Sequence, residues 1–108
     1  MKYQWHLFFA SLEPTQGSEQ AGRRPVLVIS REPINQRLPV VNVIPLTSRK
    51  SAARVIYPNE VLLPTGVVGL PVDSIALCYQ IRTLDKSRLE VESPAASQCS
   101  SIPGAKLR

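Results

Sequence analysis

Prolines break this chain into short segments and so limit the folds that it can adopt. Ten prolines and five glycines are spread over 108 residues. Because proline lacks an amide hydrogen and fixes its own φ, it interrupts helices and marks turns or the edges of strands. The sequence therefore argues against long helices and favours many short strands joined by turns.

Apolar runs between these breaks are predicted to be five strands: residues 3–12, 25–30, 40–47, 54–63 and 74–83. In the first, Trp5, Leu7 and Phe9 share one face, and Phe8 falls on the other. The third run is expected to stop pairing or to bulge at Pro45, the fourth is interrupted around residues 58–59, and the fifth bends. Residues 84–89 are expected to form a turn. Strands at this spacing indicate a mainly β fold, a small, strongly bent antiparallel sheet or partly open barrel with at most one or two turns of helix.

The length of the chain is that of one domain, which we assign to residues 1–92. Within it, residues 67–72 are apolar but broken by Gly69 and Pro71, so we interpret them as a buried connection. After Leu89 the composition shifts to serine, proline, alanine and glycine. Residues 93–108 are therefore predicted to be a poorly ordered tail.

Positive charge is concentrated in one part of the chain. Residues 20–54 contain six arginines and one lysine against a single acid, Glu32, in a chain with a net charge of +5. Arginine matches phosphate oxygens with a planar fork of donors, which favours a surface that binds a polyanion, most simply nucleic acid. The alternative is a solvated surface that only aids solubility.

Most familiar catalytic sets are missing from the sequence. His6 is the only histidine, the eight acids are scattered, and neither a GxxxxGK[ST] nor a GxGxxG loop occurs. Cys78 and Cys99 suggest neither a disulfide framework nor a zinc site, so no metal or cofactor is expected. No signal peptide and no apolar run of membrane-spanning length is found, so we expect a cytoplasmic protein without a membrane partner. Arginines, hydroxyls, amides and at most one glutamate remain, a set that suits phosphodiester cleavage.

The richest stretch for such chemistry is residues 17–30, in which a polar loop with glycine at both ends leads into a buried strand. Pro25 fixes its own φ and pushes Arg24 towards an extended backbone. Arg24 is therefore expected at the mouth of the strand, held by a rigid scaffold.

Four segments resemble the MazF/PemK toxins, the ribonuclease halves of type II toxin–antitoxin pairs. They are residues 17–30 (GSEQAGRRPVLVIS), 12–14 (LEP), 43–48 (VIPLTS), and 69–74 followed by 76–89 (ALCYQIRTLDKSRL). They occur in the family's order and cover roughly residues 7–89. The resemblance implies an SH3-like antiparallel barrel that works as a homodimer, and metal-independent, sequence-selective cleavage of single-stranded RNA in which the ribose 2′-OH attacks the phosphate to give a cyclic phosphate. It also implies a cognate acidic antitoxin. Operator DNA would be bound only by the complex of toxin and antitoxin.

The resemblance also implies roles for individual residues. Arg24 would act in acid–base chemistry or stabilise the transition state, and it would face the Thr47 hydroxyl across a shared cleft. Thr47 would hold the phosphate oxygen, and Glu19 would assist as a base or orient RNA. Because the pKa of arginine lies above 12, stabilisation of developing charge is the safer role for Arg24. The implied substrate-binding residues are Gln20, Arg23, Ser48, Arg49 and Gln80.

Other interpretations stay open at this point. Glu19 could be a loop carboxylate paired with Arg23, Thr47 could cap a turn, and Gln80 could support strands near the groove or the dimer seam. Trp5 and His6 stand where the family usually has Gly-Asp, and residues 90–108 lack the family's usual amphipathic helix. The chain could therefore be a non-catalytic module of the same fold that binds nucleic acid or protein, or a decayed, inactive toxin.

Overall fold

A computed structural model describes residues 2–17, 19, 22–51, 53–64 and 72–92 of the chain. Its strands are β1 (Leu7–Ser11), β2 (Arg23–Val28), β3 (Val40–Ser48), β4 (Glu60–Leu63), β5 (Ser74–Leu77), β6 (Arg82–Asp85) and β7 (Leu89–Glu92). Helix in this part of the chain is limited to α1 (Glu32–Asn35) and the 3-10 turns η1 (Cys78–Gln80) and η2 (Lys86–Arg88). The prediction of a mainly β fold with little helix is confirmed. The expected tail, 93–108, and most of the expected buried connection, 67–71, lie outside the described residues.

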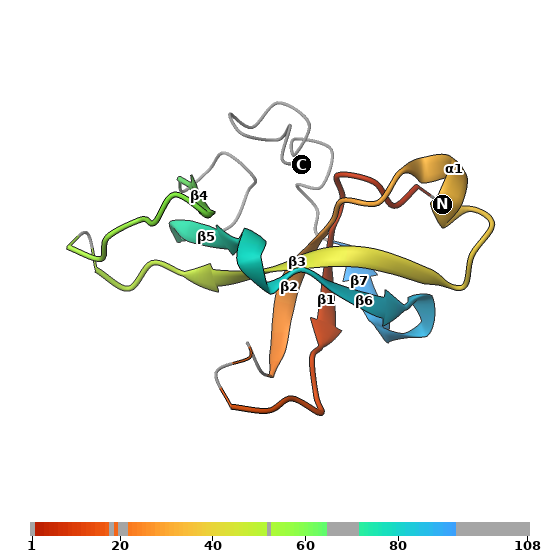
Figure 1. Cartoon of the computed structure of the whole chain (residues 1–108), viewed down its shortest axis with the longest axis horizontal. Helices are drawn as coiled ribbons and strands as arrows, with labels where there is room; N and C mark the ends of the chain where they lie inside the picture. Colours follow the sequence, from red (N-terminus) through yellow and green to blue (C-terminus); the bar gives the residue numbers. More distant parts are fainter. Residues whose placement is uncertain (1, 18, 20–21, 52, 65–71, 93–108) are drawn as a thin grey trace.

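All strand pairs are antiparallel, and β3 is the central strand. The order across the sheet is β4-β5-β3-β2-β1-β7, and β6 also pairs with β3. Figure 1 shows β1 and β2 running steeply across β3, so the sheet is strongly twisted. This is the small, strongly bent antiparallel sheet that the spacing of turns predicts.

One edge of β3 changes its partner near Pro45. Its first half, from Val40 to Val43, pairs with β6, and its last residues, from Leu46 to Ser48, pair with β5. The interval, which contains Pro45, is where η1 lies between β5 and β6. The expected stop in pairing at this proline is therefore confirmed on this edge. On the other edge, Pro45 stays in register with Val26 of β2.

The expected strand boundaries need three corrections. The first strand begins only at Leu7, because Trp5 has a φ of 66° and the chain turns there. In the fourth, only Glu60–Leu63 is extended: the preceding segment is folded into a turn in which Tyr57 N–H donates to the Glu60 carboxylate at 3.0 Å. The fifth is two strands, β5 and β6, separated by η1.

The region expected to be a turn, residues 84–89, begins and ends in strands. Asp85 still belongs to β6, the turn itself is η2, and β7 starts at Leu89 and pairs with β1. The Asp85 carboxylate accepts the Ser87 N–H at 2.9 Å, which caps η2. β7 is thus a strand that the sequence pattern did not predict.

Two hydrophobic clusters cover the two faces of the sheet. The first contains Leu7, Leu27, Ile44, Leu46, Leu63 and Ala76, and the second contains Phe8, Ala10, Leu12, Val26, Val28, Val41, Val43 and Leu84. Consecutive residues such as Leu7 and Phe8 point to opposite faces of a strand and so enter different clusters. Burial on both faces accounts for the imperfect alternation of the first strand, and Trp5 packs against the cluster that contains Leu7.

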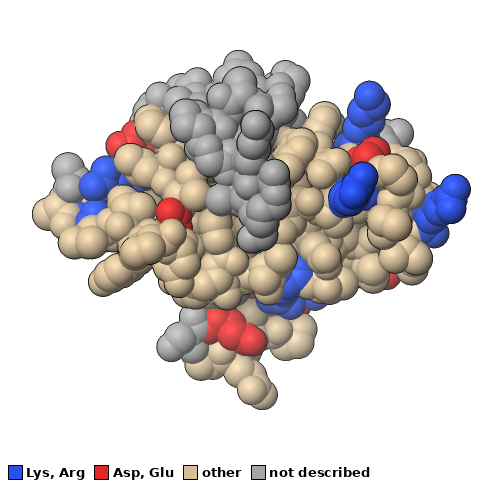
Figure 2. Space-filling model, turned by 45° about the horizontal axis from the view of Figure 1, so that its top comes forward, with Lys and Arg blue, Asp and Glu red and all other residues tan. Residues whose placement is uncertain are grey.

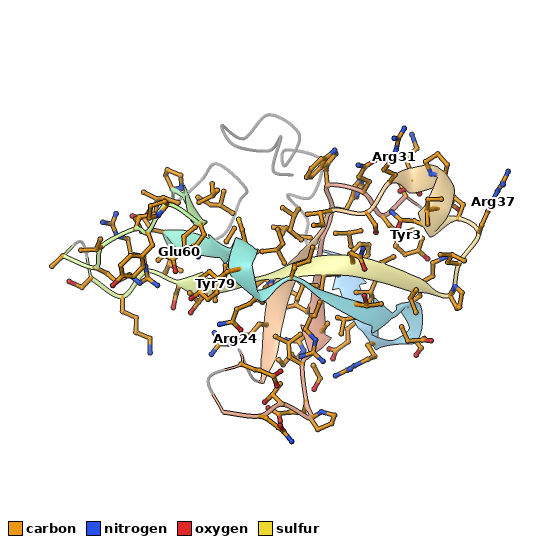
Figure 3. All side chains as sticks on the ribbon, viewed as in Figure 1. Tyr3, Arg24, Arg31, Arg37, Glu60 and Tyr79 are labelled. Carbon is orange, nitrogen blue, oxygen red and sulfur yellow. The ribbon has the colours of Figure 1, made fainter. Side chains whose placement is uncertain are left out.

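The basic residues of 20–54 are divided between different parts of the surface. Figure 3 shows Arg31 and Arg37 projecting at the α1 end, while Arg24 lies near the opposite end of β2. On the face drawn in Figure 2, blue side chains likewise appear at both ends of the molecule rather than in one patch. Only part of this charge can therefore serve any one site. No helix among the described residues is long and apolar enough to cross a membrane.

Candidate active site

Arg24 and Thr47 lie opposite each other where the ladder between β2 and β3 ends. The register pairs Val26 with Pro45, and continuing it by two residues brings position 24 to position 47. Directly opposed residues of antiparallel strands point to the same face. The Arg24 Nη1 accordingly donates to Thr47 Oγ1 across 3.4 Å. The structure thus brings these two predicted residues together, as expected.

Both residues continue rows of side chains that fill the second core cluster. On β2 the row is formed by Val26 and Val28, and on β3 it includes Val43, all fully buried. Since side chains alternate along a strand, positions 24 and 47 fall on the same side as these valines. Arg24 and Thr47 therefore lie where the core ends, at the rim of the sheet, and both side chains are half-buried.

A hollow of about 290 Å³ contains this pair, and we call it the Arg24 hollow. Its lining residues are Phe9, Arg23, Arg24, Pro25, Leu46, Thr47, Ser48, Val72 and Ser74. The lining thus combines two arginines and three hydroxyl-bearing residues with apolar residues. Permanently charged forks and hydroxyl donors are the groups that bind the oxygens of a phosphate.

Arg23 lines the same hollow but is held from another side. Its Nε donates to the Glu90 carboxylate of β7 across 2.6 Å, and its guanidinium carbon lies 4.6 Å from the centre of the Phe9 ring. The expected alternative, in which Arg23 pairs with Glu19, is therefore not what the structure has. Arg23 reaches the site as a charge fixed by β7.

Glu19 and Gln80 line a different hollow, of about 660 Å³, which we call the Glu19 hollow. Its other lining residues are Pro14, Pro45, Tyr79, Ile81, Arg82 and Thr83. The Glu19 carboxylate accepts the Gln16 N–H at 2.5 Å, which closes the loop on itself. The structure thus places Glu19 in the same hollow as Gln80.

Comparison with known proteins identifies the family. Residues 3–101 match the family described as PemK-like, MazF-like toxin of type II toxin–antitoxin system. The chain belongs to this family. The resemblance that the four sequence segments indicated is confirmed.

Individual MazF proteins are similar over most of the chain. The Endoribonuclease MazF of Staphylococcus saprophyticus subsp. saprophyticus is 42% identical over 84 residues, which are 78% of this chain and 68% of that protein. The structure of MazF from Deinococcus radiodurans has a TM-score of 0.65 at 32% identity and covers 97% of this chain and 94% of its own. The Mycobacterium tuberculosis toxin MazF-mt6, at 22% identity, has a TM-score of 0.62 over 92% of both chains, a likeness of fold alone. The MazF-type barrel predicted from the sequence is confirmed.

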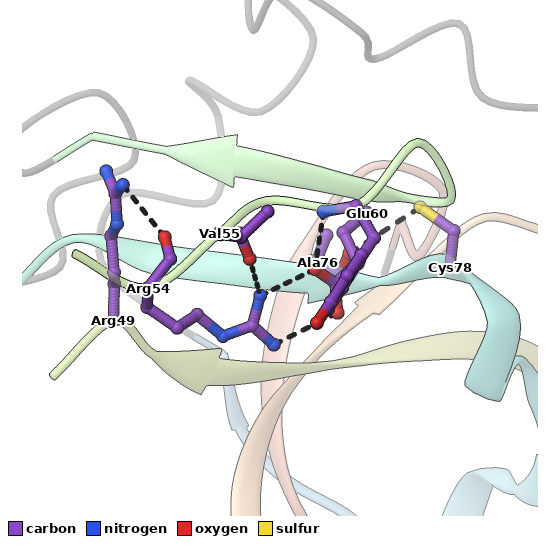
Figure 4. Close-up of polar contacts among 7 residues, drawn as sticks. Arg49, Arg54, Val55, Glu60, Ala76 and Cys78 are labelled. Atoms are coloured by element: carbon purple, nitrogen blue, oxygen red, sulfur yellow. Dashed lines mark hydrogen bonds and ion pairs between the residues drawn. The ribbon is translucent and has the colours of Figure 1, made fainter. Parts of the chain in front are cut away.

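Of the remaining predicted residues of this MazF-family chain, only some lie in the same hollow as Arg24 and Thr47. Ser48 lines the Arg24 hollow next to Thr47. Arg49 instead donates from Nη2 to the main-chain oxygen of Arg54 at 3.1 Å, so its guanidinium braces the following loop (Figure 4). Gln20 lies outside the described residues.

A cluster that the sequence analysis missed surrounds the carboxylate of Glu60. This side chain is buried and accepts both Arg54 Nη1, at 2.6 Å, and Arg54 Nη2, at 3.0 Å (Figure 4). The hydrogen bond from Arg54 lowers the pKa of Glu60, although burial opposes the shift. The signal in the sequence was a lone acid at the start of an apolar run, six residues after an arginine, because such an acid needs a partner when it is buried.

Metal and thiol chemistry find little support in the part of the chain that the structure describes. No three histidine, cysteine, aspartate or glutamate side chains there are grouped so that they could hold a metal ion. Cys78 is a free thiol, half-buried against the first core cluster. Burial raises the pKa of Cys78, which keeps it as the unreactive thiol. The groups with chemistry to offer are therefore the arginines and hydroxyls of the Arg24 hollow.

Proposed function

We propose that this protein is the toxin of a type II toxin–antitoxin pair and acts as an endoribonuclease on single-stranded RNA. Membership of the PemK/MazF family and the similarity to an Endoribonuclease MazF support this function. The observation that carries it is the Arg24 guanidinium, 3.4 Å from the Thr47 hydroxyl in a hollow at the rim of the sheet.

The reaction that fits these groups is attack of a ribose 2′-oxygen on the adjacent phosphorus. The bond from the 2′-oxygen to phosphorus forms, the bond to the 5′-oxygen breaks, and a cyclic phosphate remains. The 2′-hydroxyl loses its proton and the leaving 5′-oxygen gains one. Negative charge builds on the non-bridging oxygens during this step, and charges placed to meet it lower the barrier.

Arg24 is the group that we assign to this charge. Its guanidinium stays protonated throughout the reaction, since the pKa of arginine lies above 12. It can therefore offer two parallel N–H donors to a phosphate without any change of its own charge. Thr47 Oγ1, on the neighbouring strand, would donate to a second oxygen and fix the orientation of the phosphate. This mechanism asks for no metal ion.

The partners follow from the family and from the neighbouring structures. Among these is a MazE–MazF structure from Deinococcus radiodurans, with a TM-score of 0.58 at 32% identity and coverage of 97% of this chain. We propose a cognate acidic antitoxin that blocks the RNA-binding surface, a homodimer of the toxin, and binding of operator DNA only as the complex with antitoxin. We place the protein in the cytoplasm, where its messenger RNA substrate would be found.

Cleavage of RNA in the presence of a chelator tests the proposal. The purified protein is incubated with a single-stranded RNA of mixed sequence in EDTA, and products are analysed for a cyclic phosphate end. The wild type and Arg37→Ala, which removes an exposed arginine at the α1 end, should cut; Arg24→Ala should be slower by about a hundredfold or more with an unchanged melting temperature. Uncut RNA with the wild type would overturn the proposal, and so would equal rates for wild type and Arg24→Ala.

A further inference from the structure

Tyr79 occupies a junction on the surface that the proposed chemistry does not use. It lies in η1, and half of its surface is exposed, at 51%. Three hollows include it in their lining: the Glu19 hollow; one of about 470 Å³ with Tyr57, Pro58 and Asn59; and one of about 320 Å³ with Lys50. An exposed aromatic ring at such a junction can be reached from several directions.

The buried Glu60 carboxylate lies close to Tyr79. Glu60 pairs with Leu77, two residues before Tyr79, and Tyr79 contributes to the lowered pKa of Glu60. Glu60 is itself held by Arg54 and by the Tyr57 N–H.

Tyr57 adds a second ring to the same place. It is 57% exposed and forms a hollow together with Tyr79. The guanidinium carbon of Arg54 lies 5.8 Å from the centre of the Tyr57 ring. The cluster around Glu60 thus presents two aromatic rings to solvent beside the Arg54–Glu60 ion pair.

The hollow with Lys50 connects this aromatic pair to the Arg24 hollow. Its lining residues are Thr47, Ser48, Lys50, Ser51, Arg54, Leu77 and Tyr79. Thr47 and Ser48 also line the Arg24 hollow. In the view of Figure 3, Tyr79 lies between Glu60 and Arg24. The shared lining residues therefore connect the proposed reacting phosphate, past two hydroxyls and Lys50, to two exposed rings.

We propose that Tyr79, with Tyr57 beside it, is a stacking platform for an unpaired base of the RNA next to the cut phosphate. Single-stranded nucleic acid is bound by positive charge along its backbone and by aromatic side chains under its bases. Lys50 meets the backbone, and the tyrosines meet the base. The positive charge of Lys50, between the rings and the Arg24 hollow, favours a polyanion over an apolar peptide segment as the occupant. The inference rests on the proposed function, because it extends the RNA beyond that site.

The test compares wild type with Tyr79→Ala, Tyr79→Leu and Tyr79→Phe. Sequencing of the products from a random RNA pool first locates the cut. An oligonucleotide with a 2′-deoxy sugar at that position, which cannot be cut, then carries 2-aminopurine at successive positions, since the fluorescence of this base falls when it stacks. Wild type and Tyr79→Phe should quench it at one position. Tyr79→Ala and Tyr79→Leu should lose that quenching and bind about 5- to 150-fold more weakly.

Salt dependence separates stacking from charge. A tyrosine releases no counterions, so the slope of log affinity against log salt should stay the same in Tyr79→Ala, whereas Lys50→Ala should reduce it by about 0.7. If Tyr79→Ala still cuts RNA and shows unchanged affinity and quenching, the platform is overturned but the proposed function stands. The platform is also overturned if Tyr79→Ala binds the antitoxin more weakly and binds RNA as well as the wild type does. A wild type that binds no RNA would overturn both the platform and the proposed function.

Discussion

Arg23 is tied to Glu90, and the tie separates it in function from the arginine that follows it. The Arg23 Nε donates to the Glu90 carboxylate across 2.6 Å, which joins β2 to β7, while Arg24 turns to Thr47 on β3. Adjacent residues of a strand point to opposite faces, so the two guanidinium groups have different neighbours. Part of the Arg23 charge is already neutralised by Glu90.

We therefore expect Arg23→Gln and Arg24→Gln to differ in the step that they affect. Arg23→Gln should raise KM for RNA and leave kcat within about threefold, because it removes a positive charge that attracts the RNA backbone in substrate and transition state alike. Arg24→Gln should lower kcat by about a hundredfold or more. The pair with Glu90 is more than one-third exposed on both sides, so Arg23→Gln should change the free energy of unfolding by less than about 1 kcal/mol. Steady-state kinetics and urea unfolding measure both. A loss of kcat in Arg23→Gln equal to that in Arg24→Gln would contradict the distinction.

Thr47 should act through its hydroxyl alone. Thr47→Val keeps the shape of the side chain and removes the oxygen that lies 3.4 Å from Arg24. We expect kcat to fall about tenfold or more with the melting temperature nearly unchanged, because a neutral donor to the phosphate is lost.

Thr47→Ser is the matched control, since it keeps the hydroxyl and removes only a methyl group. It should retain most of the activity. Equal losses in the valine and serine variants would show that packing, and not the hydroxyl, is what the reaction needs at this position.

Glu19 should bind RNA rather than carry protons. It lines the hollow shared with Gln80 and Tyr79, whereas Arg24 and Thr47 line another. Glu19→Gln should therefore change KM several-fold and leave the pH dependence of kcat as in the wild type. Loss of the acidic limb of the kcat profile in this variant would instead identify Glu19 as the base.

The sequence could predict β2 and β3, the strands that carry the pair, but not the register that brings Arg24 to Thr47. Pro25 and the valines after it define a buried strand with an arginine at its mouth, and this is local information. The contact with Thr47 depends on the pairing of Val26 with Pro45, which follows from how the two strands pack on a common core. Only the family resemblance linked residues 24 and 47 before the structure did.

The position of Tyr79 beside Glu60 was missed because it arises across a ladder. Glu60 pairs with Leu77, which brings it near Tyr79 two residues further on, and no local pattern encodes that pairing. The 3-10 turn that presents Tyr79 arises where β3 changes partners near Pro45. Residues 74–83 taken alone look like one strand. The interruption by η1 is caused by β3, which changes partners there, and so it cannot be read from these residues.

Acid should weaken the attachment of the N-terminal segment to α1 through Glu32. Its carboxylate accepts the N–H groups of Tyr3, at 2.9 Å, and Gln4, at 2.8 Å. Burial by itself would raise the pKa of Glu32, but hydrogen bonds from Gln4, Gln36, Tyr3 and Asn35 outweigh it and lower the pKa to about 2 from 4.5. A group with a lowered folded-state pKa stabilises the fold above its unfolded pKa, and this stabilisation is lost as the pH falls from about 4.5 to about 2.

Glu32→Gln removes the charge that responds to pH and keeps an oxygen that can accept the same N–H groups. At pH 7 we expect it to lower the free energy of unfolding by about 1–2 kcal/mol, a value reduced for partial exposure to solvent. The difference should shrink as the pH falls below about 4.5 and should disappear only below about pH 2, where the carboxyl of the folded wild type is also largely neutral. Urea midpoints at pH 7, 4.5 and 3 measure the difference. A gap between the two proteins that stays constant over this range would show that the charge of Glu32 does not hold the N-terminal segment.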